Sequence, residues 1–179
     1  IRGRHNMANA LAALALADAV AIPREASLRA LERFAGLAHR CQWVADINGV
    51  SYYNDSKGTN VGATLAALEG LGATLPGDAR LILIAGGVGK DQSFTSLAAP
   101  LERYGRDLVL IGRDAEQIAA EVTGLQHHFA SDMADAVQRA ARLARPGDVV
   151  LLSPACASFD LFENYEDRGR QFKNAVREL

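Results

Sequence analysis

The residues best suited to chemistry form a short run, Asp-Ser-Lys-Gly-Thr-Asn at positions 55–60, between a predicted strand and a predicted helix. Asp55, at the end of a strand, can accept two hydrogen bonds from a ribose diol. Lys57 and Thr59, beside a helix N-terminus, can hold a carboxylate or a phosphate. The alternative is plain helix capping by Thr59 or Asn60, with Lys57 in solvent. The residue types alone leave both interpretations open.

A second run, Gly-Gly-Val-Gly-Lys-Asp at positions 86–91, presents Lys90 at the end of another predicted strand. It is not a nucleotide P-loop, because that motif needs a glycine five residues before the Gly-Lys pair, where this chain has Ile84. Asp91 also stands where the motif has Ser or Thr. Lys90 is therefore either a single cation presented to a ligand or an ordinary surface lysine.

The third run is Ser-Pro-Ala-Cys-Ala-Ser-Phe-Asp at positions 153–160. Its small residues let the backbone approach a ligand, and the Ser158 hydroxyl and backbone N–H groups can bind a carboxylate. A nucleophilic role for Cys156 or Ser158 would need a nearby general base. The chain's four histidines show no recognisable triad order, so carboxylate binding is the favoured interpretation.

Two weaker signals lie upstream of these runs. Asn6 and Asn9 stand three residues apart and share one face of a predicted helix, so their amides could read the edge of a base. The pair His39-Arg40 precedes a predicted hairpin and could place a guanidinium near a nucleotide. Spacing alone gives neither signal much weight.

The elements that must position these runs are helices and strands in alternation. Two Ala- and Leu-rich helices come first, followed by two strands joined by Asn48-Gly49, a pair that accepts the positive φ angles of a tight hairpin turn. The predicted helices cover residues 6–20, 24–34, 60–71, 94–104, 115–122, 133–144 and 165–179, and the predicted strands cover residues 42–47, 50–53, 80–85, 108–111, 127–129 and 149–152.

Three of the later strands, near Leu81, Leu108 and Val149, are continuous apolar runs, as expected of strands buried on both faces of a parallel sheet. The predicted fold class is α/β: a Rossmann-like, doubly wound, mostly parallel sheet with an N-terminal β-hairpin, preceded by two helices. Ligands of such sheets bind outside the carboxyl ends of the strands. The loops expected there are residues 54–60, 86–93, 112–114 and 153–159.

Composition narrows the function class. The chain has 179 residues, 49% of them hydrophobic, with a net charge of −2 and no basic stripe, so neither nucleic acid nor an anionic membrane is expected as a partner. The apolar stretch 8–22 is too short to span a bilayer and contains Asp18. Two distant cysteines are expected to be reduced thiols in a soluble, cytoplasmic protein. The first residues contain no initiator methionine, so further sequence is expected upstream.

Taken in order, these segments resemble the Mur ligase family, bacterial enzymes that build the cell-wall peptide one amino acid at a time. Residues 3–9 resemble the family's Gly-x-His-Asn-x-x-Asn segment, and residues 55–60 resemble the Asp-Ser-Lys-Ala-Thr-Asn of its D-glutamate-adding branch. Residues 153–160 and 162–169 also look like that branch. Gly58 stands where alanine is usual, which we interpret as a looser loop, and Tyr165 stands where phenylalanine is common.

The resemblance implies an ATP-dependent, ADP-forming ligase that adds D-glutamate to UDP-N-acetylmuramoyl-L-alanine through an acyl phosphate in peptidoglycan synthesis. No catalytic residue is assigned within this segment, no metal ligand is expected in it, and the ligands of the ATP phosphates and Mg²⁺ are expected upstream. The residues implied for D-glutamate are Lys57, Thr59, Lys90, Ser158 and Tyr165. Those implied for ATP are Asn6, Asn9, Arg40 and Asp55, with His39 as a further candidate.

The resemblance also implies a division of the chain. Residues 1–36 would be the end of a central ATP-binding domain, and residues 37–179 a C-terminal Rossmann-like domain that binds the amino acid, with a hinge at residues 37–41. A monomer is expected, and residues 1–179 alone are expected to be inactive. Two alternatives stay open: another amino-acid ligase of the family, or a nucleotide-binding module without catalysis.

Overall fold

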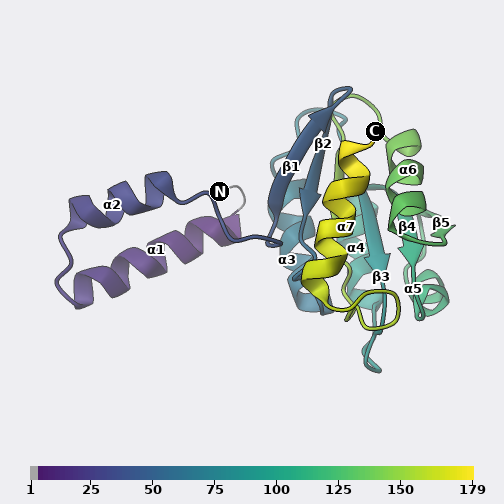
Figure 1. The fold of residues 1–179 in the computed structure, drawn as a ribbon, viewed down its shortest axis with the longest axis horizontal. Helices are drawn as coiled ribbons and strands as arrows, with labels where there is room; N and C mark the ends of the chain where they lie inside the picture. Colours follow the sequence, from purple (N-terminus) through teal and green to yellow (C-terminus); the bar gives the residue numbers. More distant parts are fainter. Residues whose placement is uncertain (1–3) are drawn as a thin grey trace.

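The protein's structure, a computed structural model, describes residues 4–179, with side chains from residue 6 onward. Residues 1–3, which include Gly3 of the segment expected to contact adenine, lie outside the described residues, as does the side chain of His5. Figure 1 shows an α/β unit with a helical pair set to one side.

The α/β unit is built on a six-stranded sheet with strand order β1-β2-β6-β3-β4-β5. Only β1 and β2 pair antiparallel, and every other neighbouring pair is parallel. This confirms the predicted fold class, including the hairpin at one edge. The strands are β1 (Gln42–Ile47), β2 (Val50–Asn54), β3 (Leu81–Gly86), β4 (Gly105–Ile111), β5 (Gln126–Ala130) and β6 (Val149–Leu152).

The hairpin turn has the geometry that its sequence predicts. Asn48 and Gly49 both have positive φ angles, 52° and 79°, the conformation that a two-residue turn between right-twisted strands requires. The turn sets the register in which Ile47 pairs with Val50 and Ala45 with Tyr52, and a bulge between Trp43 and Ala45 then shifts the pairing so that Trp43 lies opposite Tyr53. On its other side β2 pairs with β6, with Asn54 opposite Leu152, so the run 55–60 begins beside the carboxyl end of β6.

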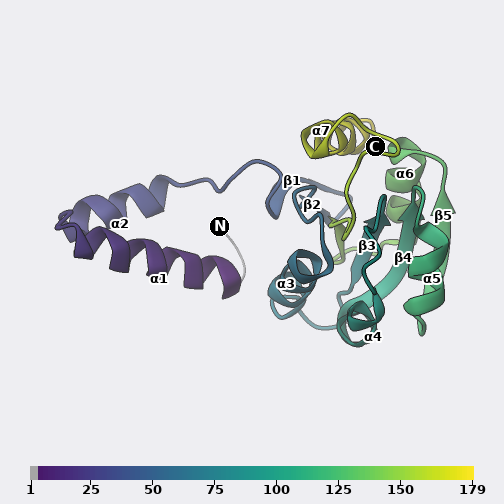
Figure 2. The ribbon, with the colours of Figure 1, turned by 90° about the horizontal axis from the view of Figure 1, so that it is seen from below.

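Helices cover both faces of the sheet, as Figure 2 shows. The apolar sides of α3, α4 and α5 pack in one buried cluster, which includes Leu68, Leu101 and Ile118, and those of α6 and α7 pack in another, which includes Val137 and Phe172. Two cores on opposite faces are the signature of a doubly wound sheet. These helices are α3 (Val61–Gly72), α4 (Ala98–Tyr104), α5 (Ala115–Glu121), α6 (Met133–Leu143) and α7 (Tyr165–Arg177).

One predicted helix is partly wrong. Residues 94–104 form a 3₁₀ turn, Thr95–Leu97, followed by α4. Glu121 on α5 explains the tighter start, because its carboxylate accepts hydrogen bonds from the Ser93 hydroxyl at 2.8 Å and the Phe94 N–H at 2.6 Å. Such 3₁₀ turns are frequent at helix N-termini, but a bond from another helix cannot be read from the local sequence.

The two N-terminal helices, α1 (Arg4–Ala19) and α2 (Arg24–Arg33), pack against each other and join the sheet through one extended segment (Figures 1 and 2). Large apolar side chains are exposed on α1 and just after it: Leu11 and Leu16 on the helix are 67% and 71% exposed, and Val20 is 70% exposed. None of the helices in residues 4–179 is long and apolar enough to cross a membrane. The division at residues 36 and 37 remains a prediction.

A single carboxylate accepts four hydrogen bonds at the end of the sheet opposite the runs 55–60, 86–91 and 153–160. Asp148 is 1% exposed and accepts hydrogen bonds from the N–H groups of Arg80 and Arg145, both at 2.8 Å. The Arg106 guanidinium adds two more, at 2.6 and 3.1 Å. Burial by itself would raise the pKa of Asp148, but these four donors outweigh burial and hold the pKa below its ordinary value.

We expect Asp148→Asn to lower the free energy of unfolding by about 2–3 kcal/mol at pH 7, because an amide turns one acceptor into a donor that faces the four donors. A lowered folded-state pKa stabilises the fold above the unfolded pKa of about 4, and this contribution is lost as the pH falls through the folded value. Urea unfolding should show that the difference in the free energy of unfolding between wild type and Asp148→Asn is smaller at pH 3 than at pH 7. Asp78→Asn, at an exposed site near Asp148 on the same end of the sheet, is the control and should behave like wild type at both pH values.

Candidate functional site

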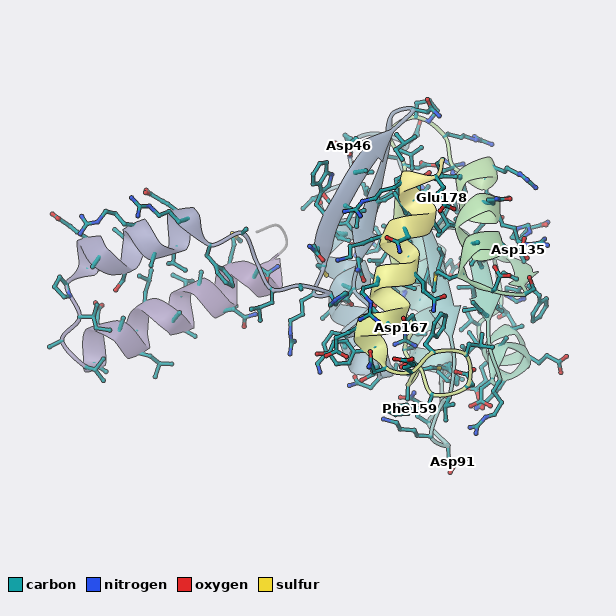
Figure 3. All side chains as sticks on the ribbon, in the orientation of Figure 1. Asp46, Asp91, Asp135, Phe159, Asp167 and Glu178 are labelled. Carbon is teal, nitrogen blue, oxygen red and sulfur yellow. The ribbon has the colours of Figure 1, made fainter. Side chains whose placement is uncertain are left out.

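Three chemically interesting loops meet at the carboxyl edge of the sheet. They follow β2, β6 and β3, which are neighbours in the sheet. Val88 and Ala157, from two of the loops, exchange a pair of backbone hydrogen bonds at 2.9 Å. Figure 3 labels Asp91 and Phe159, from the same two loops, at one end of the molecule. The topology therefore brings together runs that lie far apart in the sequence.

Lys57 is positioned by the aromatic ring at the start of α7. Its Nζ lies 3.8 Å from the centroid of the Tyr165 ring, a cation–π contact. The next residue back, Ser56, donates its hydroxyl to the Tyr165 carbonyl at 2.8 Å, and the Lys57 N–H donates to the His39 carbonyl at 3.0 Å. Asn60 caps α3 by accepting from the Ala63 N–H at 2.9 Å, so Thr59 is not needed as the cap.

Lys90 stands at the tip of the loop after β3, with an exposed side chain. Lys90 and Asp91 both have positive φ angles, 56° and 58°, which non-glycine residues adopt rarely. The turn is anchored by Asp114, whose carboxylate accepts from the Gly89 N–H at 2.6 Å. Gly87 brings the loop close to Ala157, because a Cβ there would lie 2.2 Å from the Ala157 carbonyl oxygen.

Ser158 lies in the loop after β6 and is 2% exposed. Its carbonyl accepts from the Phe162 N–H at 2.9 Å, which folds the loop back on itself. Among the side chains that the structure describes, none is hydrogen-bonded to the Ser158 hydroxyl. Ser158 thus lies between the Val88 pairing and the start of α7, with its hydroxyl not engaged by a general base.

A buried arginine, which the sequence analysis did not single out, ties two of these loops to α7. Arg168 is 1% exposed, and its guanidinium donates to the Ser56 hydroxyl at 3.0 Å, the Ser56 carbonyl at 2.9 Å and the Cys156 carbonyl at 3.1 Å. Burial lowers the pKa of Arg168 to about 10, so it is still a cation at neutral pH. The only sequence signal was its place within the family-like run 162–169.

Asp55 is buried beneath the segment that leads in from α2. It is 7% exposed, and its carboxylate accepts from the Cys41 N–H at 3.0 Å and the Ser153 hydroxyl at 2.7 Å. A Cβ on Gly58 would lie 2.7 Å from both Asp55 Oδ2 and Ser153 Oγ. The absence of a side chain at Gly58 thus leaves room for this hydrogen bond, and the looser loop stays a prediction.

His39 is locked in the same segment with a φ angle of 62° and 7% exposure. The Asn54 amide donates to the Gly169 carbonyl at 3.1 Å and lies 3.1 Å from His39 Nδ1. Burial, and then the charge of Lys173, lower the pKa of the imidazole, so the neutral ring accepts from Asn54. A Cβ on Gly169 would fall 2.1 Å from His39 Nδ1, so α7 can approach only through a glycine.

A cavity of about 540 Å³ lies between the helical pair and the hairpin, within the size range of small-molecule sites. Three of the predicted ATP-binding residues, Asn6, Asn9 and Arg40, line it together with the aromatic rings of Trp43 and Tyr53. Asp55 and His39 do not line this cavity. The structure thus brings Asn6 and Asn9, both on α1, together with Arg40, which follows α2 in the chain.

Nucleophilic and metal chemistry find no support in the described residues. Cys156 is fully buried, and burial raises the pKa of its thiol to about 12, so it is not a thiolate at neutral pH. Both cysteines are free thiols, as predicted. Within residues 4–179 no group of three or more His, Cys, Asp or Glu side chains is arranged to hold a metal ion.

The sequence matches known proteins along its whole length. Residues 39–156 match the family described as Mur ligase, glutamate ligase domain. The chain is 57% identical over 180 residues to UDP-N-acetylmuramoylalanine–D-glutamate ligase of Pseudomonas aeruginosa and 54% identical to that of Nitrosococcus oceani. These alignments cover all of this chain but 40% and 39% of the relatives, so the chain spans about two fifths of their length.

Solved structures of lower identity share the fold. UDP-N-acetylmuramate–alanine ligase MurC of Thermotoga maritima superposes with a TM-score of 0.72 at 17% identity, covering 99% of this chain and 39% of that one. UDP-N-acetylmuramoylalanyl-D-glutamyl-2,6-diaminopimelate–D-alanyl-D-alanyl ligase of Acinetobacter baumannii gives a TM-score of 0.68 at 19% identity, covering 98% of this chain and 37% of that one. At such identities the likeness supports the architecture alone.

We expect Arg168→Lys to lower the free energy of unfolding by about 3 kcal/mol, because a lysine cannot reach three acceptors on two loops and leaves buried carbonyls unsatisfied. Urea unfolding measures the change. Arg170→Lys, two residues along the same helix, keeps a charge at an exposed ion pair with Asp167 and should change stability by about 0.5 kcal/mol or less. Equal effects of the two substitutions on the free energy of unfolding would contradict the role of Arg168 in joining the two loops to α7.

Two helical glycines provide a matched test of the contact with His39. Gly169→Ala should destabilise the protein by about 2 kcal/mol, since a methyl group overlaps the imidazole. Gly62→Ala, in the first turn of α3, has its nearest neighbour at 3.5 Å and should gain about 0.5–1 kcal/mol from helix propensity. Thermal unfolding should show a lower Tm than wild type for Gly169→Ala and a higher Tm for Gly62→Ala. A stabilised Gly169→Ala protein would mean that α7 does not pack on His39.

Proposed function

This chain belongs to the Mur ligase family, and on that basis we propose that it is the C-terminal part of an ATP-dependent ligase that adds D-glutamate to UDP-N-acetylmuramoyl-L-alanine. The observation that carries the proposal is the identity of 54–57% over 180 residues with UDP-N-acetylmuramoylalanine–D-glutamate ligases. The converging lysine and serine loops provide groups for the chemistry.

The proposed reaction joins a carboxylate to an amine. ATP phosphorylates the alanine carboxylate of the nucleotide precursor, the D-glutamate amine attacks the acyl phosphate, and the tetrahedral intermediate expels phosphate. Every reactant is anionic, so cations must offset the repulsion and hold the reactants in line. The ligands of the ATP phosphates and of Mg²⁺ are proposed to lie upstream of this chain.

We place D-glutamate at the carboxyl edge of the sheet. Lys57, held against the Tyr165 ring, and Lys90, at the tip of its anchored loop, are proposed to bind the two carboxylates. The hydroxyls of Thr59 and Ser158 would add hydrogen bonds. Tyr165 would wall the site with its ring while it positions the Lys57 ammonium.

ATP is proposed to enter from the cavity between the helical pair and the hairpin. Asn6 and Asn9 would read the adenine edge, and Arg40 would contact the nucleotide. Asp55 would accept the ribose hydroxyls at a position that Cys41 and Ser153 fix. His39 stays a further candidate for the nucleotide, and its ring, held by Asn54, is proposed to hold the backbone beside Arg40.

Two other functions compete with this proposal. Ligases for other amino acids share the fold, and a nucleotide-binding module without catalysis would use the same cavity.

The full-length protein that carries this chain should release phosphate with ATP, Mg²⁺, UDP-N-acetylmuramoyl-L-alanine and D-glutamate, and not with L-glutamate, L-lysine or meso-diaminopimelate. Phosphate release with one of these three amino acids instead would support the family but contradict D-glutamate as the substrate. Residues 1–179 alone should show no turnover, and no release by the full-length protein would favour the binding module.

Lysine variants test the D-glutamate site. In the full-length protein, Lys57→Ala and Lys90→Ala should each raise the KM for D-glutamate about tenfold or more, because each loses a charge-assisted hydrogen bond to a carboxylate. Lys173→Ala, on α7 outside the three loops, is the matched control. It should leave the KM for D-glutamate within about twofold of the wild-type value. Steady-state phosphate release at varied D-glutamate gives the values. An unchanged KM for D-glutamate in both variants would contradict the proposed binding of D-glutamate by these two lysines.

A further inference from the structure

Outside the residues already discussed, one side chain touches all three loops of the carboxyl edge. The Gln92 Nε2 donates to the Ala155 carbonyl at 2.7 Å, and its Oε1 accepts from the Val61 N–H at 3.2 Å. Val61 is the first residue of α3, next to the run 55–60, and Ala155 lies in the run that carries Ser158. Gln92 itself follows Lys90 by two residues.

Both partners of the Gln92 amide need a bond. The N–H of Val61 is one of the N-terminal donors that a helix leaves without an internal acceptor, and the cap residue of α3, Asn60, bonds to Ala63 instead. Ala155 is fully buried with a φ angle of 59°, so its carbonyl has lost access to water in a rarely populated conformation. The amide satisfies a donor on one loop and an acceptor on another.

The backbone of Gln92 is fixed as well. Its N–H donates to the Gly89 carbonyl at 3.3 Å, and its carbonyl accepts from the Gln117 side chain at 3.2 Å. The first of these bonds closes the turn whose tip is Lys90. A shift of the Gln92 side chain would therefore move the Lys90 turn relative to the other two loops.

Only a glutamine has the length and the chemistry for this position. The side chain must donate and accept at once, which an amide can do and a carboxylate cannot. Asparagine is one methylene shorter. Glutamate would still accept from Val61 but would place a charge against the Ala155 carbonyl, and methionine fills the space with neither bond.

We propose that Gln92 is a positioning residue that holds Lys57, Lys90 and Ser158 in the relative geometry that D-glutamate binding requires. This proposal rests on the proposed function, since the three side chains are the ones assigned to D-glutamate. Gln92 does not touch the amino acid and acts through the loops. The hydrogen bonds of its side chain go to Val61 and Ala155, whereas Asn6, Asn9 and Arg40, proposed for the nucleotide, line the cavity beside the hairpin.

The test is the steady-state kinetics of the full-length protein with Gln92→Met, Gln92→Glu and the control Gln138→Met, the same substitution at an exposed site on α6. We expect Gln92→Met to raise the KM for D-glutamate about tenfold, since it loses two hydrogen bonds between loops. Gln92→Glu should raise it further. The KM for ATP should stay within about twofold in all three variants, well under one tenfold step.

A purely structural role would change the KM values for ATP and D-glutamate together, so a parallel rise would overturn the proposal. An unchanged KM for D-glutamate in Gln92→Met would also overturn it. If the wild-type protein shows no D-glutamate-dependent release, the proposed function itself fails and the positioning role fails with it. If the wild type is active and Gln92→Met matches it, only the inference about Gln92 fails.

Hydrogen exchange reports on the loop contact without any substrate. In Gln92→Met the amide of Val61 should exchange about tenfold faster than in wild type, because its acceptor is gone. The amides of α6 should be unchanged and serve as the internal control. Equal protection of Val61 in both proteins would show that the contact with Gln92 does not hold the start of α3, and would overturn the inference.

Discussion

The carboxyl edge of this sheet depends on one buried cation. Within the part of the chain that the structure describes, no carboxylate is hydrogen-bonded to the Arg168 guanidinium, which donates instead to the Ser56 hydroxyl and the carbonyls of Ser56 and Cys156. A buried charge is costly unless its donors are used, so these two loops cannot move independently of α7. The loops that carry Lys57 and Ser158 thereby share one rigid support.

The same helix also determines how the N-terminal segment meets the sheet. Gly169, next to Arg168, leaves the space in which His39 packs, and Asn54 joins the two by hydrogen bonds. Asp55 adds a bond to Cys41. The expected hinge at residues 37–41 is therefore held at its C-terminal side by the loop that begins the candidate site. A few polar contacts join the segment that carries Arg40 to the run that carries Lys57.

Much of the fold followed from local patterns. Continuous apolar strands, alternation with helices and the Asn48-Gly49 turn each have a local physical cause, so the strand and helix boundaries came within a few residues of the structure. The split of residues 94–104 did not follow, because Glu121 bonds to Phe94 from another helix. The close approach of Gly58 to Ser153 did not follow either, since Ser153 lies far along the chain.

The sequence by itself determined the α/β class, the family and the chemically suited side chains, because residue type, spacing and local periodicity are properties of the chain alone. Only the tertiary structure decided which of those side chains meet: Lys57 against Tyr165, Asn6 with Arg40 around one cavity, and Asp55 against Ser153. It also revealed Arg168 and Gln92, whose parts depend on unsatisfied backbone groups of other loops. Such groups become partners only when the sheet brings distant segments together and excludes water.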